Sequence, residues 1–339
     1  MSSASVPRTC LVIVAAALFV LVGPGRAESE PKPAPRFPAV SNGDAWKQLR
    51  GEDPPLPAWA LVLAPSLPRT TGAMLRLDYV HRARNPLGPI LAGKLHWTAA
   101  NALGCAYGKR YAEADLRRAG LDDEDLKTLA GPVKEQPKED RVAIAFARKM
   151  TRAADTVTDA EVAALLEQFG PEKVVAMVHT LAWANFQYRI LLGLNVAVEA
   201  GGPLVPLDPH LDRERQAKLT APARPAWEEV QTILVPEKAL TRLDWGKRTH
   251  ADLVTALDRQ KDRKPRIPLP DASRLDNLPE EVKSQATKIV WSNVSMGYQP
   301  QLTQTWFETM RAFQQEAKLD RVFANSYFWV ITRSNDCFY

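Results

Sequence analysis

The stretch TDAEVAALLEQFGPEKVVAMVHTLAWANFQYRILLGL, residues Thr158 to Leu194, decides the fold class. Thr158 and Glu161 have the spacing of a capping box, which predicts the start of a helix. Gly170 is typical of a helix end, and Pro171 suits the first turn of the next helix. The apolar residues of the first helix recur at i, i+3, i+4 and i+7, the spacing of one helix face: Val162, Leu165, Leu166 and Phe169.

The same helical pattern extends from about residue 46 to residue 200, and no alternating strand pattern of useful length occurs. We therefore predict an all-α helical bundle over residues 46–200. In RVAIAFARKM (residues 141–150) the pattern indicates one apolar face, made of Val142, Ala145, Phe146 and Met150. Helical spacing predicts six core side chains: Phe146, Leu165, Leu166, Phe169, Val178 and Phe186.

The first residues are typical of an export signal. Arg8 precedes an apolar run that is short for a membrane span, and the small residue Ala27 follows it. We predict that residues 1–27 are a signal peptide and that the protein is periplasmic or secreted; the alternative is an uncleaved anchor. Residues 28–45 are rich in proline and charge and are predicted to form a linker.

The rest of the chain divides into two parts that differ in proline content and in helical pattern. Residues 201–273 are predicted to be a proline-rich connector with short helices, and helical pattern resumes over residues 274–339. The formal net charge is +5 with no run of like charge, which argues against nucleic-acid binding. His210 lies between two aspartates, but a solvated loop is the favoured interpretation there. We predict no metal and no cofactor.

The two ends of the chain can be aligned without a gap. Trp291 follows Trp59 by 232 residues (291 − 59 = 232), and four further identities have the same offset. They pair residues 68 with 300, 97 with 329, 105 with 337 and 107 with 339. Mostly rare residue types at one offset indicate an internal duplication, so residues 274–339 are predicted to be the first part of a second repeat.

Residues 46–198 resemble the carboxymuconolactone decarboxylase and alkylhydroperoxidase D superfamily. The resemblance rests on the stretches LHWTAANALGCAYGKRYAEADLRRAGL, EDRVAIAFARKMTRAADTVTDAEVAALLEQFG and VVAMVHTLAWANFQYRILLGLNV, which follow the family order. It implies a compact all-α bundle that assembles as a homo-oligomer. In the peroxidase branch it also implies a Cys-x-x-Cys pair, a histidine that follows the pair and an upstream glutamate.

The first repeat keeps one residue of that motif. Cys105 holds the first cysteine position, but Gly108 holds the second and Ala112 holds the position of the relay histidine. The upstream acid position falls near residues 93 and 94, a glycine and a lysine. The nearby His81 and His96 lack the family spacing and are interpreted as ordinary helix residues, while Cys105 is expected to be a small buried residue.

In the second repeat, Cys337 holds the first cysteine position, and the second position would be residue 340. Cys337 is therefore the candidate peroxidatic thiol, and Cys105 is its weak equivalent. We expect that the next codon is a UGA that encodes selenocysteine and was treated as termination. A nonsense mutation, a fragment and a genuine terminus remain the alternatives.

Three functions follow as expectations. The first is an exported thiol antioxidant protein of the alkylhydroperoxidase type, inactive or incomplete over these 339 residues. Its partners would be a peroxide or disulfide substrate and a thiol electron donor, with no nucleic acid and no membrane beyond the signal peptide. The second is a non-catalytic helical scaffold that binds a ligand or a partner. The third is a lyase of the carboxymuconolactone decarboxylase type.

Overall fold

The computed structural model describes residues 36–51, 54–211, 214, 218–219, 249–261, 264–278, 280–283 and 290–334. The predicted signal peptide (residues 1–27) and Cys337 lie outside the described residues. The described part is helical and contains no strand, so the all-α fold class is confirmed.

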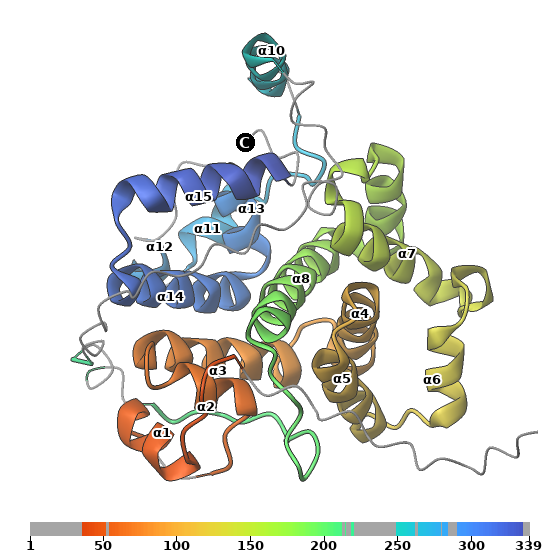
Figure 1. Cartoon of the computed structure of the whole chain (residues 1–339). Coiled ribbons are helices and arrows are strands. Elements are labelled where there is room, and N and C mark those ends of the chain that lie inside the picture. Colours follow the sequence, from red (N-terminus) through yellow and green to blue (C-terminus); the bar gives the residue numbers. More distant parts are fainter. Residues whose placement is uncertain are drawn as a thin grey trace, which may run out of the picture. The chain divides into compact units, whose positions relative to one another are not determined.

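From α1 to α8 the helices follow one another with short connections (Figure 1). The helices up to residue 153 are α1 (Asn42–Leu49), α2 (Ala58–Leu63), α3 (Pro68–Ala83), α4 (Gly88–Leu103), α5 (Ala106–Arg118), α6 (Asp123–Ala130) and α7 (Lys138–Ala153). The later helices are α8 (Asp159–Leu194), α10 (His250–Lys261), α11 (Ala272–Asp276), α12 (Glu280–Lys283), α13 (Val290–Tyr298), α14 (Pro300–Ala317) and α15 (Arg321–Ser334). Two 3₁₀ turns, η1 (Val133–Glu135) and η2 (Ala154–Thr156), flank α7.

Side chains near the helix starts explain several boundaries. The capping box predicted at the start of α8 is present, because Thr158 accepts from the backbone N–H of Glu161 and Glu161 accepts from that of Thr158. Asp122 and Asp125 form a second capping box at α6. Each box satisfies backbone donors that the helix itself leaves unpaired.

Gly170 interrupts α8 as the sequence predicts. Its φ of 73° and ψ of 166° are not helical, and Pro171 follows in the first turn of the second half. A residue with a side chain rarely adopts positive φ, so glycine is suited to this position. The two halves therefore run in different directions within one continuous element.

The second half of α8 lies at the centre of the core. α8 contacts α4, α5, α7, α13 and α14 (Figure 1). Among the predicted core residues, Phe146 and Leu165 are fully buried, at 6% and 0% exposure. The other four are half-buried and pack against the core: Leu166, Phe169, Val178 and Phe186.

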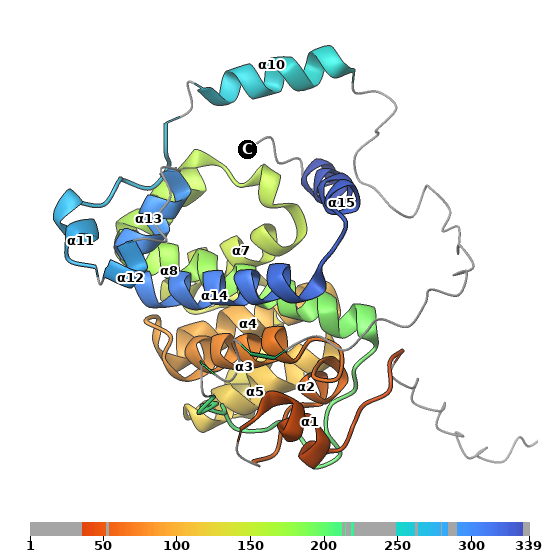
Figure 2. The ribbon, with the colours of Figure 1, turned by 90° about the vertical axis from the view of Figure 1, so that its left-hand side faces the viewer.

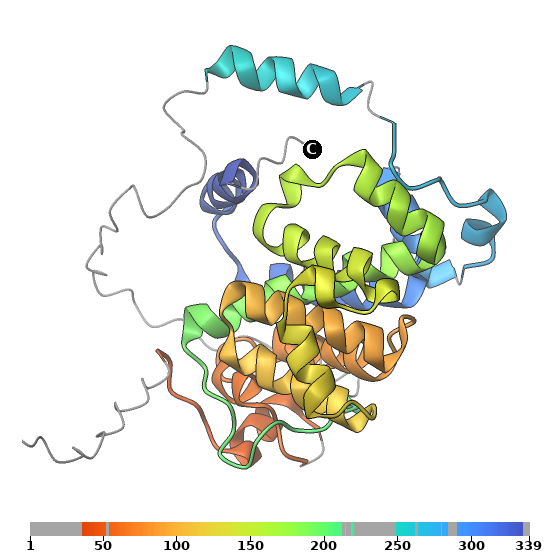
Figure 3. The same cartoon turned by 90° about the vertical axis from the view of Figure 1, so that its right-hand side faces the viewer.

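The predicted face of α7 is wrong in one position. Ala145 is exposed, whereas Ala143 and Ile144 are fully buried. The reason is that α7 packs against both α4 and α8, so two sides of the helix are covered. Figure 3 shows the yellow-green α7 from the side opposite to that of Figure 2.

Helix α14 lies along α3 (Figure 2). Both helices have a proline in the first turn, and the residues that precede them, Leu67 and Gln299, share the same backbone conformation. Helix α14 begins 232 residues after α3 (300 − 68). Burial differs at another pair with this offset: Trp59 is 1% exposed and Trp291 is 43% exposed.

The chain that follows α8 returns across α3 and α5. The backbone carbonyl of Leu204 accepts hydrogen bonds from Arg82 at 2.8 Å and from Arg118 at 3.3 Å. This contact fixes one end of the predicted connector on the bundle. None of the described helices combines the length and the apolar character that a membrane span requires.

Candidate functional site

Cys105 lies at the junction of α4 and α5. Gly104 ends α4 with a φ of 69°, the left-handed conformation that glycine adopts most readily. Cys105 is the N-cap of α5, and its Sγ accepts a hydrogen bond from the N–H of Gly108 at 3.4 Å. The sequence thus delivers a thiol to a helix N-terminus, where a thiolate would be favoured.

Burial affects the pKa of the Cys105 thiol more than the helix N-terminus does. Cys105 is 2% exposed, which confirms its expected burial. Desolvation raises the pKa of the Cys105 thiol, although hydrogen bonds from the backbone of Gly108 and Tyr107 oppose the shift. A neutral thiol in an apolar setting is a poor nucleophile, so Cys105 is a packing residue here.

The position of a second thiol is filled by an aromatic ring. A Cβ atom at Gly108 would lie 2.4 Å from Cε1 of Tyr188, which is far inside van der Waals contact. At the upstream acid position, a Cβ on Gly93 would lie 2.7 Å from Leu116 Cδ2. The next residue, Lys94, forms an ion pair with Asp140 at 2.5 Å. No part of the cysteine relay implied by the resemblance is assembled around Cys105.

Two buried histidines approach each other beside this junction. His81 on α3 and His96 on α4 are 1% and 7% exposed, and their ring centroids are 6.4 Å apart. His81 stacks on Trp183 at 5.9 Å, and Nδ1 of His96 lies 3.1 Å from the hydroxyl of Tyr188. Burial lowers the pKa of His96 to about 4 and that of His81 well below its ordinary value, so both rings are neutral at pH 7.

Arg82 organises a buried ion-pair network next to the histidines. Its guanidinium donates to Asp115 at 2.7 and 3.0 Å and to Asp78 at 3.2 Å. Arg118 also pairs with Asp115, and Gln187 donates to Asp78 at 3.1 Å. Burial raises the pKa of Asp78, whereas for Arg82 the two carboxylates overcome burial and raise the pKa of the guanidinium. The charges of this network compensate each other.

The network and the histidines border a cavity of about 180 Å³. His81, His96, Arg82 and Asp115 line it, and its other walls are mostly proline, alanine and glycine. Gly93 and Ala112, the positions of the implied relay residues, contribute no polar side chain to it. Among the described residues, no cluster of three or more potential metal ligands occurs.

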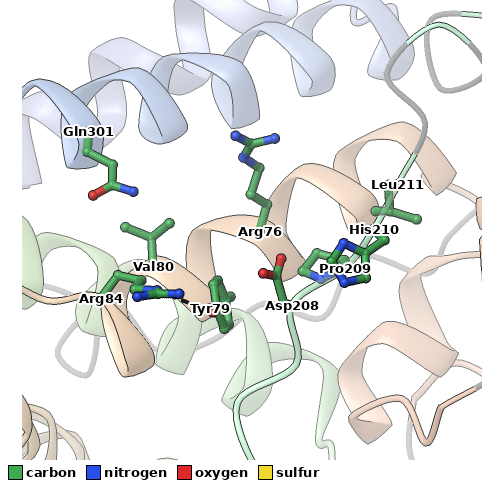
Figure 4. A pocket seen from close by; sticks show the side chains of 9 residues that line it. All are labelled: Arg76, Tyr79, Val80, Arg84, Asp208, Pro209, His210, Leu211 and Gln301. Atoms are coloured by element: carbon green, nitrogen blue, oxygen red, sulfur yellow. Dashed lines mark hydrogen bonds between the residues drawn. The ribbon is translucent and has the colours of Figure 1, made fainter.

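A second, wider groove of about 600 Å³ lies between α3, α14 and the segment that follows α8 (Figure 4). Arg76, Arg84 and Asp208 line it with the exposed His210. Its charged groups lie at the surface. We therefore regard the smaller cavity as the stronger candidate site.

Of the residues that the sequence singled out, the structure brings His81 and His96 together at one cavity, and Cys105 does not line it. Sequence reasoning missed the residues that surround them: Asp78, Arg82, Asp115, Gln187 and Tyr188. The i,i+4 spacing of Asp78 and Arg82 was the one local signal. Cys337 lies outside the described residues.

Comparisons with known proteins identify no relative of this chain. No protein-family model, no curated protein and no solved structure matches it.

Proposed function

We propose that the chain is an exported, alkylhydroperoxidase-like protein built from two repeats. In this proposal residues 46–200 form a scaffold without thiol chemistry, and Cys337 of the second repeat carries the redox function. Its substrates would be peroxides or disulfides, with a thiol compound as electron donor. The observation that carries the proposal is the closed surrounding of Cys105.

Two features of that surrounding exclude a reactive pair in the first repeat. Cys105 is buried with a raised pKa. The ring of Tyr188 occupies the space that a side chain at Gly108 would need. A redox thiol needs a thiolate and access to its partner, so the role passes to Cys337.

The arrangement of the helices supports the duplication. Helix α14 keeps the 232-residue offset from α3, and it packs along α3. Equivalent interactions also recur: Thr71 donates to the carbonyl of Leu67, and Thr303 donates to that of Gln299. In this proposal the first repeat provides the surface on which the second one folds.

Single-thiol proteins test the proposal. The third cysteine, Cys10, lies in the predicted signal peptide and is absent from a chain that begins at residue 28. In that chain Cys105→Ser leaves only Cys337, and Cys337→Ser leaves only Cys105. We expect iodoacetamide to alkylate Cys337 with a pKa clearly below the ~8.5 of a free cysteine, and to reach Cys105 only after unfolding. A pKa of 8.5 or higher at Cys337 would overturn the proposal.

That outcome would favour the second candidate, a non-catalytic helical protein that binds a ligand or partner. One observation supports it independently. The first repeat keeps a cavity that is lined by His81, His96, Arg82 and Asp115, although the implied relay residues are absent.

A further inference from the structure

The wider groove, of about 600 Å³, has charged side chains on two opposite sides (Figure 4). Gln301 from α14 and Arg84 from α3 lie on one side, and Asp208, from the segment that follows α8, lies on the other. Val80 and Pro209 are buried in its wall and make that wall partly apolar. A volume of this order is typical of pockets that bind small molecules.

Residues that are 232 positions apart face each other across α3 and α14. Nε of Arg76 on α3 lies 3.8 Å from a carboxylate oxygen of Glu308 on α14, and 308 − 76 = 232. Contact between equivalent positions of two packed helices is the mark of a local twofold axis. A contact at one end of this helix pair therefore has an equivalent place at the other end.

One end of the helix pair shows how a carboxylate is bound. Glu316, in the last turn of α14, accepts from the N–H groups of Arg69 and Thr70 in the first turn of α3, at 3.0 and 2.8 Å. Such N–H groups have no partner within their own helix. A carboxylate satisfies them and is also favoured by the positive end of the helix dipole.

The other end of the pair has an equivalent helix start but no carboxylate. Gln301 occupies the position equivalent to Arg69 (301 − 69 = 232), and Arg84 occupies the position equivalent to Glu316 (316 − 84 = 232). Gln299, which precedes α14, offers no side-chain cap. At this end the groove is open instead, and Gln301 and Arg84 both line it. An arginine beside a helix start suits a carboxylate that comes from a ligand.

The charged groups of the groove are of both signs and are separated from each other. Arg84 donates to the hydroxyl of Tyr79 at 3.3 Å, and Asp208 is exposed. Within the described part of the chain, neither of the two forms an ion pair. A simple acid would be repelled by Asp208, and a simple amine would be repelled by Arg84. A ligand that carries both charges can pair with each of them.

We propose that the groove binds a small zwitterion with an apolar body, the chemistry shared by free apolar amino acids and short peptides. Its carboxylate would accept from Arg84 and from the first turn of α14, as Glu316 accepts at the opposite end. Its ammonium group would pair with Asp208, and its body would lie against the apolar wall. This site goes beyond the proposed thiol function and does not depend on Cys337.

Titration calorimetry of the full chain with leucine and with leucyl-leucine tests the site. We expect saturable one-to-one binding, and the tighter ligand shows whether the groove takes free amino acids or peptides. Leucinamide lacks the carboxylate and 4-methylpentanoate lacks the ammonium group, so each should bind at least about tenfold more weakly than leucine. Absence of binding by both leucine and leucyl-leucine, or equal binding of either incomplete probe, would overturn the proposal.

Variants at exposed positions show which groups hold the ligand. Arg84→Gln and Asp208→Asn should each weaken binding of the tighter ligand about tenfold. Arg84→Glu should abolish it, because it reverses the charge and places at this end the carboxylate that Glu316 provides at the other. Arg311→Gln is the matched control, at an exposed arginine of α14 that does not line the groove.

Circular dichroism confirms that each variant is folded. Unchanged binding by any of the three groove variants, or an equal loss in the control, would overturn the proposal, whatever the reactivity of Cys337.

Discussion

At the scale of single residues, Gly108 determines what the first repeat can do. It stands at the second cysteine position, and its missing side chain leaves room for the ring of Tyr188. That ring in turn contacts His96. One small residue therefore replaces a thiol with a packed aromatic contact.

Replacing Gly108 with Ala should destabilise the protein by about 3 kcal/mol, since the new methyl group overlaps the buried Tyr188 ring. Urea unfolding followed by circular dichroism measures this. Gly193→Ala is the matched control, because it lies on the exposed side of α8 with nothing within 4 Å of the added atom. The control should gain up to about 1 kcal/mol from helix propensity. Equal effects of the two substitutions would contradict the steric explanation.

The sequence predicted the residues of the site better than their roles. Cys105 stood out by its type and was correctly expected to be buried. His81 and His96 were interpreted as ordinary helix residues, because a histidine's spacing along the chain does not show which other helix it meets. The pairing of Arg82 with Asp115, which joins α3 to α5 across 33 residues, leaves no local pattern.

At the scale of helices, α14 caps the start of α3. Leu67 precedes α3 and offers no side-chain cap. Instead, Glu316 accepts hydrogen bonds from the N–H of Arg69 at 3.0 Å and from the N–H and hydroxyl of Thr70 at 2.8 Å. A carboxylate at a helix N-terminus is also favoured by the helix dipole.

Removing that carboxylate tests how firmly α14 is held. Glu316 is 4% exposed, so Glu316→Ala should cost about 3 kcal/mol by leaving buried donors unpaired. Glu308→Ala on the same helix removes a looser ion pair with Arg76 at 3.8 Å and should cost less than about 1 kcal/mol. Chemical denaturation compares the two. A smaller loss for Glu316→Ala than for Glu308→Ala would show that the cap contributes little.

Helix starts and breaks could be predicted because their causes are local. The capping box at Thr158 and the break at Gly170 depend on residues a few positions apart. The buried face of α7 could not be predicted as well. Ile144 packs in a second cluster with Trp97 and Leu116, and it was not part of the predicted four-residue face.

At the scale of the whole molecule, three histidines link the stability of the protein to pH: His81 and His96 are buried, and His179 is half-buried. Burial lowers the pKa of His96 and of His179 to about 4 and that of His81 well below its ordinary value. The unfolded chain binds these protons near pH 6.5. Below that pH the unfolded state therefore holds more protons than the folded one, and stability falls as the pH falls.

We expect the free energy of unfolding to decrease steadily between pH 6.5 and about pH 4. His96 alone, with a pKa lowered from 6.5 to about 4, accounts for about 3 kcal/mol at the acid end. The raised pKa of Asp78 has the opposite effect, because it favours the folded state as the pH falls. It is a single group, whereas three histidines act in the first direction. Urea unfolding at pH 7.5, 6.5, 5.5 and 4.5 measures the profile.

His179→Gln should flatten this profile, because it removes one of the three titrations while an amide can keep the contact that His179 makes with Thr303 at 3.3 Å. His210→Gln is the matched control, since it makes the same substitution at an exposed position. Stability that stays constant or rises from pH 6.5 to 4.5 would mean that the histidines are not buried as neutral rings. The cavity between α3, α4 and α5 would then be open to water, and the rings of His81 and His96 would be charged in acid.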